Sequence, residues 1–138
     1  MSNPHRSVKD TLYEQVARIG KALSSPKRLE LLEMLAQSDK TVERLATELS
    51  IDVKLTSAHL KALNEARLVQ SRRDGKYIVY RLSGPDVAHM GVTLREVAEE
   101  HLVELRMAVG TMMAEPSKLS KVGRADLPRH QKTLQLFV

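Results

Sequence analysis

The chain has 138 residues, of which 42% are apolar and 28% carry a charged side chain. This balance is typical of one folded domain with a single modest core, and it excludes wholesale disorder. No run reaches the roughly 18 apolar residues of a membrane-spanning helix. The first 30 residues contain no apolar signal core, so we expect a cytoplasmic protein with no membrane partner. Cysteine is absent, which excludes disulfides, thiolate metal sites and cysteine nucleophiles.

Positive charge is concentrated in the middle of the chain. Lys and Arg outnumber Asp and Glu by 22 to 17, which gives a net charge of +5. Residues 52–85 hold seven basic and three acidic residues, whereas residues 86–115 hold two basic and six acidic ones. This asymmetry predicts that one surface meets a polyanion while another serves a different partner. Aromatic residues make up only 3% of the chain, which disfavours single-strand binding by base stacking.

Two helices are predicted in the first third of the chain. Apolar residues recur every three or four positions over 7–23, the repeat of a helix face. Ser24 and Ser25 can cap backbone amides and Pro26 suits a first turn, so a second helix should span about 26–37. The residues expected to face the core are Val16, Ile19, Leu29, Leu32 and Leu35.

Two shorter helices should follow, over about 41–49 and 53–66. A capping box at Thr41 fails because Arg44 stands where a carboxylate or amide is needed, whereas Asp52 can cap the later helix. The apolar positions of the later helix are Leu55, Leu60 and Leu63, and the residues of the two helices expected in the core are Leu45, Leu60 and Leu63. Two short helices joined by about three residues form a helix-turn-helix, whose second member enters the major groove in known complexes.

A β-hairpin is predicted directly behind this motif. The runs 68–73 and 76–82 are β-prone, and Asp74-Gly75 between them supplies the positive φ angles of a two-residue type I′ turn. A hairpin in this place is a wing. Its cations are Arg72, Arg73, Lys76 and Arg81. Cations on a protruding ribbon suit contact with DNA phosphates or the minor groove.

A long helix is predicted from Asp86, which can cap it, to about residue 114. At 1.5 Å per residue it would measure about 43 Å, longer than one small domain can cover. We therefore expect its apolar stripe to pack against a second subunit. Residues 1–115 would form one DNA-binding and dimerisation domain, and residues 116–138 a basic tail.

Five stretches follow one another along the chain: ALSSPKRLELL (22–32), VERLA (42–46), SAHLKAL (57–63), RRDGK (72–76) and YRL (80–82). Together and in this order they resemble the ArsR/SmtB winged-helix repressors. The resemblance implies an α+β, mostly helical fold: a winged helix-turn-helix with a two-stranded wing and a long C-terminal dimerisation helix. It also implies a homodimer, double-stranded operator DNA, and repression relieved by a small effector. The opening stretch resembles the subgroup often fused to a rhodanese domain, although these 138 residues hold no such domain.

The DNA-facing residues are predicted on the second helix of the helix-turn-helix and on the wing. Lys54 could reach guanine or phosphate, Ser57 a base or phosphate, and Thr56 the DNA backbone. His59 either bonds a phosphate or packs between two helices, and its place in the family motif favours DNA. The predicted DNA-binding set is Lys54, Thr56, Ser57, His59, Lys61, Arg72, Arg73 and Lys76.

Two features depart from the family pattern. Arg67 stands where family members usually have Gly, which predicts a different helix end and an altered wing approach. The effector site also departs, because the family's thiolate sites need cysteines that are absent here.

The sequence leaves the effector open. Four residues on the long helix resemble the interhelical zinc or nickel site of some family members: Asp86, His89, His101 and Glu104. Imidazole and carboxylate bind these metals without a thiol. That site usually has one residue between its Asp and first His, whereas here there are two, and His101 lies on the apolar stripe, where a packed interface histidine is the plainer interpretation. An apolar or anionic effector, or none, is equally open.

The sequence predicts a sequence-specific double-stranded DNA-binding transcriptional regulator that acts as a repressor. The alternative is a winged-helix module that contacts protein through its long helix and reads no specific DNA. We expect no enzyme, because no glycine-rich phosphate loop or nucleophile elbow is present.

Overall fold

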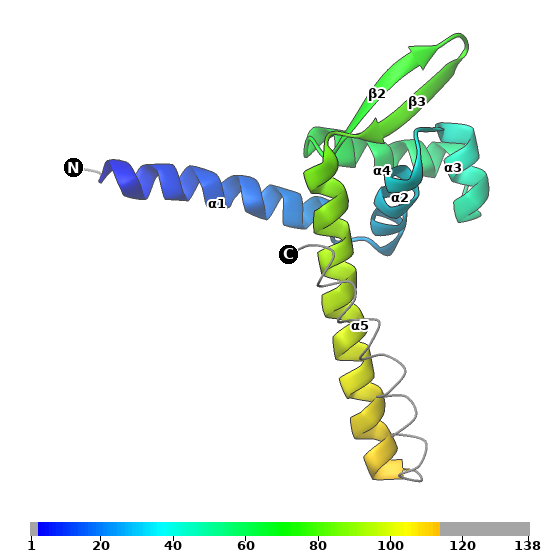
Figure 1. Cartoon of the computed structure of the whole chain (residues 1–138). Helices are drawn as coiled ribbons and strands as arrows, with labels where there is room; N and C mark the ends of the chain where they lie inside the picture. Colours follow the sequence, from blue (N-terminus) through cyan, green and yellow to red (C-terminus); the bar gives the residue numbers. More distant parts are fainter. Residues whose placement is uncertain (1–2, 114–138) are drawn as a thin grey trace. The chain divides into compact units, whose positions relative to one another are not determined.

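The computed structural model describes residues 3–113. In chain order they form α1 (Pro4–Ala22), α2 (Pro26–Gln37), β1 (Lys40–Thr41), α3 (Val42–Leu49), α4 (Val53–Glu65), β2 (Val69–Asp74), β3 (Tyr77–Leu82) and α5 (Pro85–Met113). The chain divides into two compact units, 1–88 and 89–138, and α5 continues from the first into the second (Figure 1). The mostly helical α+β fold is confirmed. The tail expected over 116–138 lies outside the described residues.

Polar side chains fix where the first four helices begin. The N-cap residues are Asn3, Ser25, Thr41 and Asp52, and each side chain accepts a backbone N–H of the first turn. α1 begins earlier than expected because Asn3 and Pro4 start it before the apolar repeat sets in. Thr41 caps α3 although Arg44 cannot complete the box. α5 begins one residue before the expected cap, so Asp86 lies in its first turn.

The wing hairpin is present, and a strand that the sequence does not reveal joins it. β2 and β3 pair as predicted, while β1 pairs antiparallel with β3 to give the order β1-β3-β2. In this pairing Lys40 lies opposite Tyr80, and Thr41 opposite Val79. β1 therefore ties the hairpin to the connection between α2 and α3.

The hairpin turn differs from the prediction. Asp74 pairs with Tyr77, so the two loop residues are Gly75 and Lys76. Gly75 has φ +61°, whereas Asp74 and Lys76 do not have positive φ. A positive φ at the first loop position alone is the pattern of a type II′ turn, which places Gly there. The type I′ prediction was wrong because β2 runs one residue further than the sequence pattern indicated.

The core of the first unit lies among α2, α3, α4 and the sheet. Five of the predicted core residues are buried: Leu32, Leu35, Leu45, Leu60 and Leu63. The predictions for Val16 and Leu29 were wrong, since these side chains are 50% and 40% exposed. α2 is apolar on two sides, and it is Leu31 rather than Leu29 that is fully buried. Ile19 is half-buried.

α3 and α4 both end at a left-handed residue that is not glycine. Ser50 has φ 57° and Arg67 has φ 64°. After α4 the Arg67 N–H donates to the Asn64 carbonyl at 2.9 Å, and the Leu68 N–H donates to the Leu63 carbonyl at 3.0 Å. These are the two bonds of a Schellman motif. The helix therefore ends as it would with Gly at this position, and the different end expected from Arg67 was wrong.

Candidate nucleic-acid interface

α4 turns one polar face away from the core. Lys54, Ser57, Ala58 and Lys61 are exposed, whereas Leu60 on the opposite side is fully buried. Steps of three and four residues place the exposed group on one side of the helix. α3 packs against α4 and the hairpin follows directly, which is the arrangement of a winged helix-turn-helix.

Thr56 does not belong to this exposed face. Its side chain is fully buried, and its hydroxyl donates to the carbonyl of Asp52 at 2.8 Å. The prediction that this hydroxyl reaches the DNA backbone was therefore wrong. The helical repeat places Thr56 on the side of Leu60 and Leu63, and only its polar type suggested a DNA contact.

His59 lies between α4 and α2. Its Nδ1 accepts a hydrogen bond from Nε of Arg28 at 3.1 Å, and its ring is half-buried. Burial lowers the pKa of His59 below 6.5, and the Arg28 guanidinium lowers it further. The contact with Arg28 confirms the packing role that the sequence left open. A phosphate contact stays a prediction.

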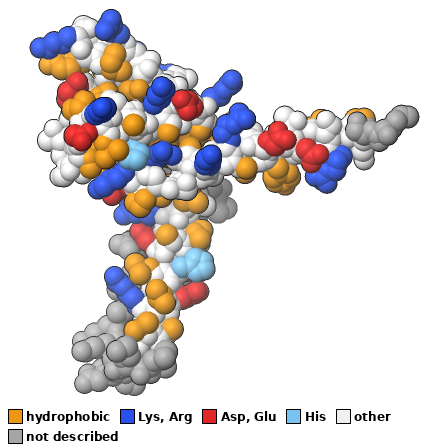
Figure 2. Space-filling model, turned by 180° about the vertical axis from the view of Figure 1, so that it is seen from behind, with side chains coloured by type: hydrophobic (Ala, Val, Ile, Leu, Met, Phe, Trp, Pro, Cys, Tyr) orange, Lys and Arg blue, Asp and Glu red, His pale blue; other side chains and the backbone are white. Residues whose placement is uncertain are grey.

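The wing carries its cations on both sides of the hairpin. Arg72 lies opposite Val79 and Arg73 opposite Ile78 in the strand register, so the two arginines lie on opposite faces. Nη1 of Arg72 lies 2.7 Å from Oδ2 of Asp39, in the connection between α2 and β1. Arg73 is exposed. Figure 2 shows several Lys and Arg side chains on one face of the first unit, residues 1–88.

The wing tip holds the remaining predicted cation. The Lys76 ammonium lies 5.3 Å from the centre of the Tyr77 ring, a cation–π contact that leaves the ammonium at the surface. Arg81, nearer the base of the hairpin, donates to Oε1 of Gln70 at 3.3 Å.

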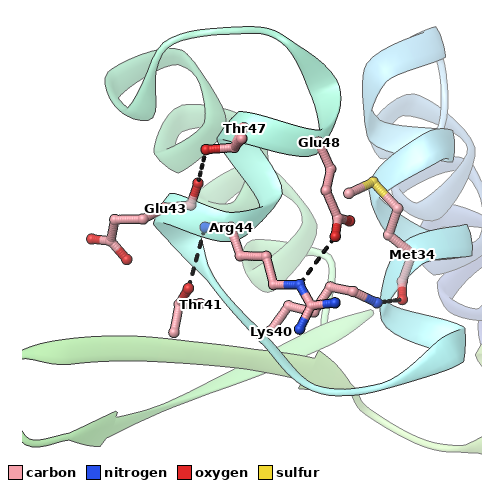
Figure 3. A network of polar contacts seen from close by, with 7 residues as sticks. All are labelled: Met34, Lys40, Thr41, Glu43, Arg44, Thr47 and Glu48. Atoms are coloured by element: carbon pink, nitrogen blue, oxygen red, sulfur yellow. Dashed lines mark hydrogen bonds and ion pairs between the residues drawn. The ribbon is translucent and has the colours of Figure 1, made fainter.

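Two charged residues at the start of β1 make contacts that the sequence patterns do not indicate. Lys40 is only 4% exposed, and its Nζ donates to the Met34 carbonyl at 2.7 Å near the end of α2 (Figure 3). A cation at a helix carboxyl end is favourable because the last carbonyls lack helical partners. Asp39, next to it, holds Arg72. Neither residue belongs to a helix or a long strand, so no periodic pattern could indicate its role.

The predicted metal residues do not converge within one chain. On α5, Nδ1 of His101 lies 3.8 Å from Oε2 of Glu104, and both side chains are exposed. His89 lies about 18 Å from His101 along the helix at 1.5 Å per residue. Asp86 is engaged locally, where its Oδ1 accepts the Val87 N–H at 3.1 Å. Within residues 3–113, no three His, Asp or Glu side chains form a group that could hold a metal ion.

No helix in the described range 3–113 combines the length and apolar character needed to cross a bilayer. The long helix α5 carries several charged residues, among them Arg95, Glu99 and Glu104. Several apolar residues of α5 are exposed as well, among them Leu94, Val97 and Leu105.

Comparison with known proteins identifies relatives over most of the chain. Residues 25–71 match the family described as bacterial regulatory protein, arsR family. The HTH-type transcriptional regulator Rv0324 of Mycobacterium tuberculosis is 38% identical over 124 residues, which cover 90% of this chain and 54% of that protein. The chain thus spans about half the length of this relative. The uncharacterized regulator Rv0081 of the same species is 33% identical over 101 residues, covering 72% of this chain and 88% of the relative.

Solved structures agree with these relatives. The homodimeric winged helix-turn-helix DNA-binding domain of a possible ArsR-family regulator from Mycobacterium bovis superposes with a TM-score of 0.66 at 41% identity, covering 74% of this chain and 91% of that one. The crystal structure of M. tuberculosis Rv0081 superposes with a TM-score of 0.62 at 30% identity, covering 75% of this chain and 97% of that one. With a matching family model and relatives covered over most of their length, the chain belongs to the ArsR family of bacterial transcriptional regulators.

Proposed function

We propose that the chain binds a specific double-stranded operator as a homodimer and represses transcription. α4 enters the major groove, and the wing contacts the adjacent backbone or minor groove. The exposed polar face of α4, followed directly by a basic wing, carries this proposal. The proposed contact residues are Lys54, Ser57, His59, Lys61, Arg72, Arg73 and Lys76. A relative from Streptomyces lividans, 30% identical over 92 residues, is named a probable mercury resistance operon repressor, which supports repression.

Exposed apolar side chains on α1 and α5 support the homodimer. On α1, Leu12, Tyr13 and Val16 are 56%, 62% and 50% exposed, and on α5 Leu105 is 60% exposed. Apolar stripes of this length are costly in water and are typical of helices that pack in an interface. The M. bovis relative is homodimeric, which supports a second copy as the partner.

Fluorescence anisotropy on DNA from the upstream region of the gene tests the proposal. Unlabelled DNA of the same sequence should compete far better than random DNA. Lys54→Ala and Lys61→Ala should each weaken binding and lower the salt slope by about 1, because each removes a cation that displaces counterions. Lys9→Ala, an exposed cation on α1, is the matched control and should bind as the wild type does. Equal competition by random DNA would favour the protein-interaction module instead.

A metal effector is the second candidate, and the proximity of His101 to Glu104 favours it. The four predicted ligands, Asp86, His89, His101 and Glu104, would come from two copies of the chain, with two ligands on each of two antiparallel α5 helices. Zinc or nickel, added to the complex after chelator treatment, should release the DNA from the wild type but not from His101→Ala. DNA binding that is indifferent to both metals would contradict a metal effector and leave an apolar or anionic effector, or none.

A further inference from the structure

The side chain of Arg28 links three helices of the first unit. It lies in the first turn of α2 and is half-buried. Its Nε donates to Nδ1 of His59 on α4 at 3.1 Å, and its Nη1 donates to the carbonyl of Ala22, the last residue of α1, at 3.4 Å. The guanidinium thus joins the end of α1 to the middle of the predicted recognition helix.

This contact determines which nitrogen of His59 carries the hydrogen. Arginine stays protonated and can only donate, so Nδ1 must offer its lone pair. In a neutral ring the hydrogen then lies on Nε2, which becomes a donor. Oε1 of Glu96 is the buried side-chain polar atom without a partner among the residues described. Nε2 of His59 is not such an atom, so this edge of the half-buried ring is not fully enclosed by the protein.

His59 also lies where the exposed face of α4 meets its buried side. Ala58 just before it and Leu55 one turn earlier are exposed, whereas Leu60 just after it is fully buried. A donor at such an edge is suited to the phosphate backbone that borders the groove, since side chains at the centre of the face reach the bases.

We propose that Arg28 is a positioning residue for DNA binding: it holds His59 in the Nε2–H tautomer, and that Nε2–H donates to a phosphate oxygen of the operator. The proposal rests on the proposed DNA-binding function and adds a mechanism to it. In the opposite tautomer the Nε2 lone pair would face the phosphate oxygen and repel it. Arg28 acts through the imidazole and does not itself touch DNA.

Two substitutions at His59 separate the nitrogens. Asn retains an acceptor near the Nδ1 position and has no donor near Nε2, whereas Gln brings an amide donor near Nε2 and loses the acceptor. His59→Asn should weaken operator binding by about tenfold, as expected for one hydrogen bond to a charged group. The salt slope should not change, because no cation is lost. His59→Gln should recover most of the affinity.

Arg28→Met tests the positioning role. This variant should weaken binding by a similar factor, and the double variant Arg28→Met/His59→Asn should be no weaker than His59→Asn alone. A double variant in which the two losses multiply would overturn the proposed route through His59. Nitrogen-15 NMR of the imidazole should show the hydrogen on Nε2 in the wild type and a mixture of the Nε2–H and Nδ1–H tautomers in Arg28→Met. A hydrogen on Nδ1 in the wild type would overturn the proposal outright.

Lys54→Ala distinguishes failure of this proposal from failure of the DNA interface. If Lys54→Ala weakens binding and His59→Asn does not, the phosphate contact is wrong and the interface stands. If both variants bind as the wild type does, the interface on α4 and the contact of His59 are both wrong.

Discussion

Arg67 and Ser50 hold a backbone conformation that L-residues avoid. The left-handed region costs a non-glycine residue about 1 kcal/mol or more, because Cβ comes too close to the following carbonyl oxygen. The Schellman bonds after α4 hold Arg67 there, and its side chain is exposed. The conformational free-energy cost at Arg67 is therefore offset by the backbone hydrogen bonds and packing of the helix-turn-helix, not by a contact of the arginine side chain.

Arg67→Gly should stabilise the fold. Removing Cβ relieves the strain, while the greater freedom of glycine in the unfolded chain offsets part of the gain, so the free energy of unfolding should rise by about 0.5–1 kcal/mol. Urea denaturation at one fixed protein concentration measures it. Arg81→Gly, at a strand position without positive φ, is the matched control and should lose stability. An Arg67→Gly variant less stable than the wild type would contradict the prediction.

His59 should make stability depend on pH. Its pKa in the folded chain lies below 6.5, first because of burial and then because of Arg28. Between pH 6.5 and the lower pKa of the folded chain, His59 binds a proton in the unfolded chain but not in the folded chain. The free energy of unfolding should therefore fall as the pH falls through this window, and the contribution should be complete above 6.5. Thermal melts across the window should show this slope in the wild type and a smaller one in His59→Asn.

The direction of each side chain on α4 could be predicted better than its role. A helical repeat fixes which residues share a side, so the exposure of Lys54 and the burial of Leu60 follow from the sequence. The polar type of Thr56 suggests a DNA contact, whereas its place in the helical repeat puts it on the buried side of α4. The contact of His59 with Arg28 joins residues 31 positions apart, and local patterns carry no information about such a pair.

At the scale of elements, the cations of the wing should contribute unequally to the salt dependence of DNA binding. Arg73→Ala and Lys76→Ala should each lower the salt slope of DNA binding by about 1. Arg72→Ala should lower it less, because Asp39 already neutralises this guanidinium at 2.7 Å. Asp39→Asn, which releases Arg72, should raise both the affinity and the slope. Anisotropy titrations at several salt concentrations measure all four variants, and an Arg72→Ala slope equal to that of Arg73→Ala would contradict the pairing.

The hairpin could be predicted from its turn dipeptide and its two β-prone runs, but its surroundings could not. β1 has two residues, too few for an alternating pattern. Lys40 belongs to a residue type that is almost always exposed, yet the carboxyl end of α2 accepts its ammonium. The turn moved by one residue because register depends on pairing across the sheet as well as on the dipeptide.

At the scale of the whole molecule, the exposed stripes of α1 and α5 should govern oligomeric state and DNA affinity together. Leu105→Glu should shift the chain toward monomers and weaken operator binding, because a buried unpaired carboxylate is costly and a single half-site contact is weaker. Met107→Glu introduces the same charge on another side of α5 and is the matched control. Sedimentation measurements beside anisotropy check the prediction, and a dimeric Leu105→Glu would contradict it.

For α5 the length of the helix predicts a second subunit as the partner of its stripe, whereas for α1 the apolar repeat predicts a buried face but not what buries it. Val16 has the spacing of a core residue, and within the chain it is 50% exposed. An apolar repeat predicts that a helix face is buried, but it does not distinguish burial within one chain from burial between two chains.

Thr41 has two structural tasks. It is a residue of β1, paired with Val79 in the wing, and it is also the N-cap of α3, where its hydroxyl accepts the Arg44 N–H (Figure 3). The hairpin base therefore cannot swing without disturbing the first turn of the helix-turn-helix. In the proposed interface, the distance between the DNA segment bound by α4 and the segment bound by the wing is then fixed by the protein. Overwinding or underwinding the duplex changes the distance between the two DNA segments that must fit this fixed length. The free energy of operator binding should therefore depend on the superhelical state of the DNA.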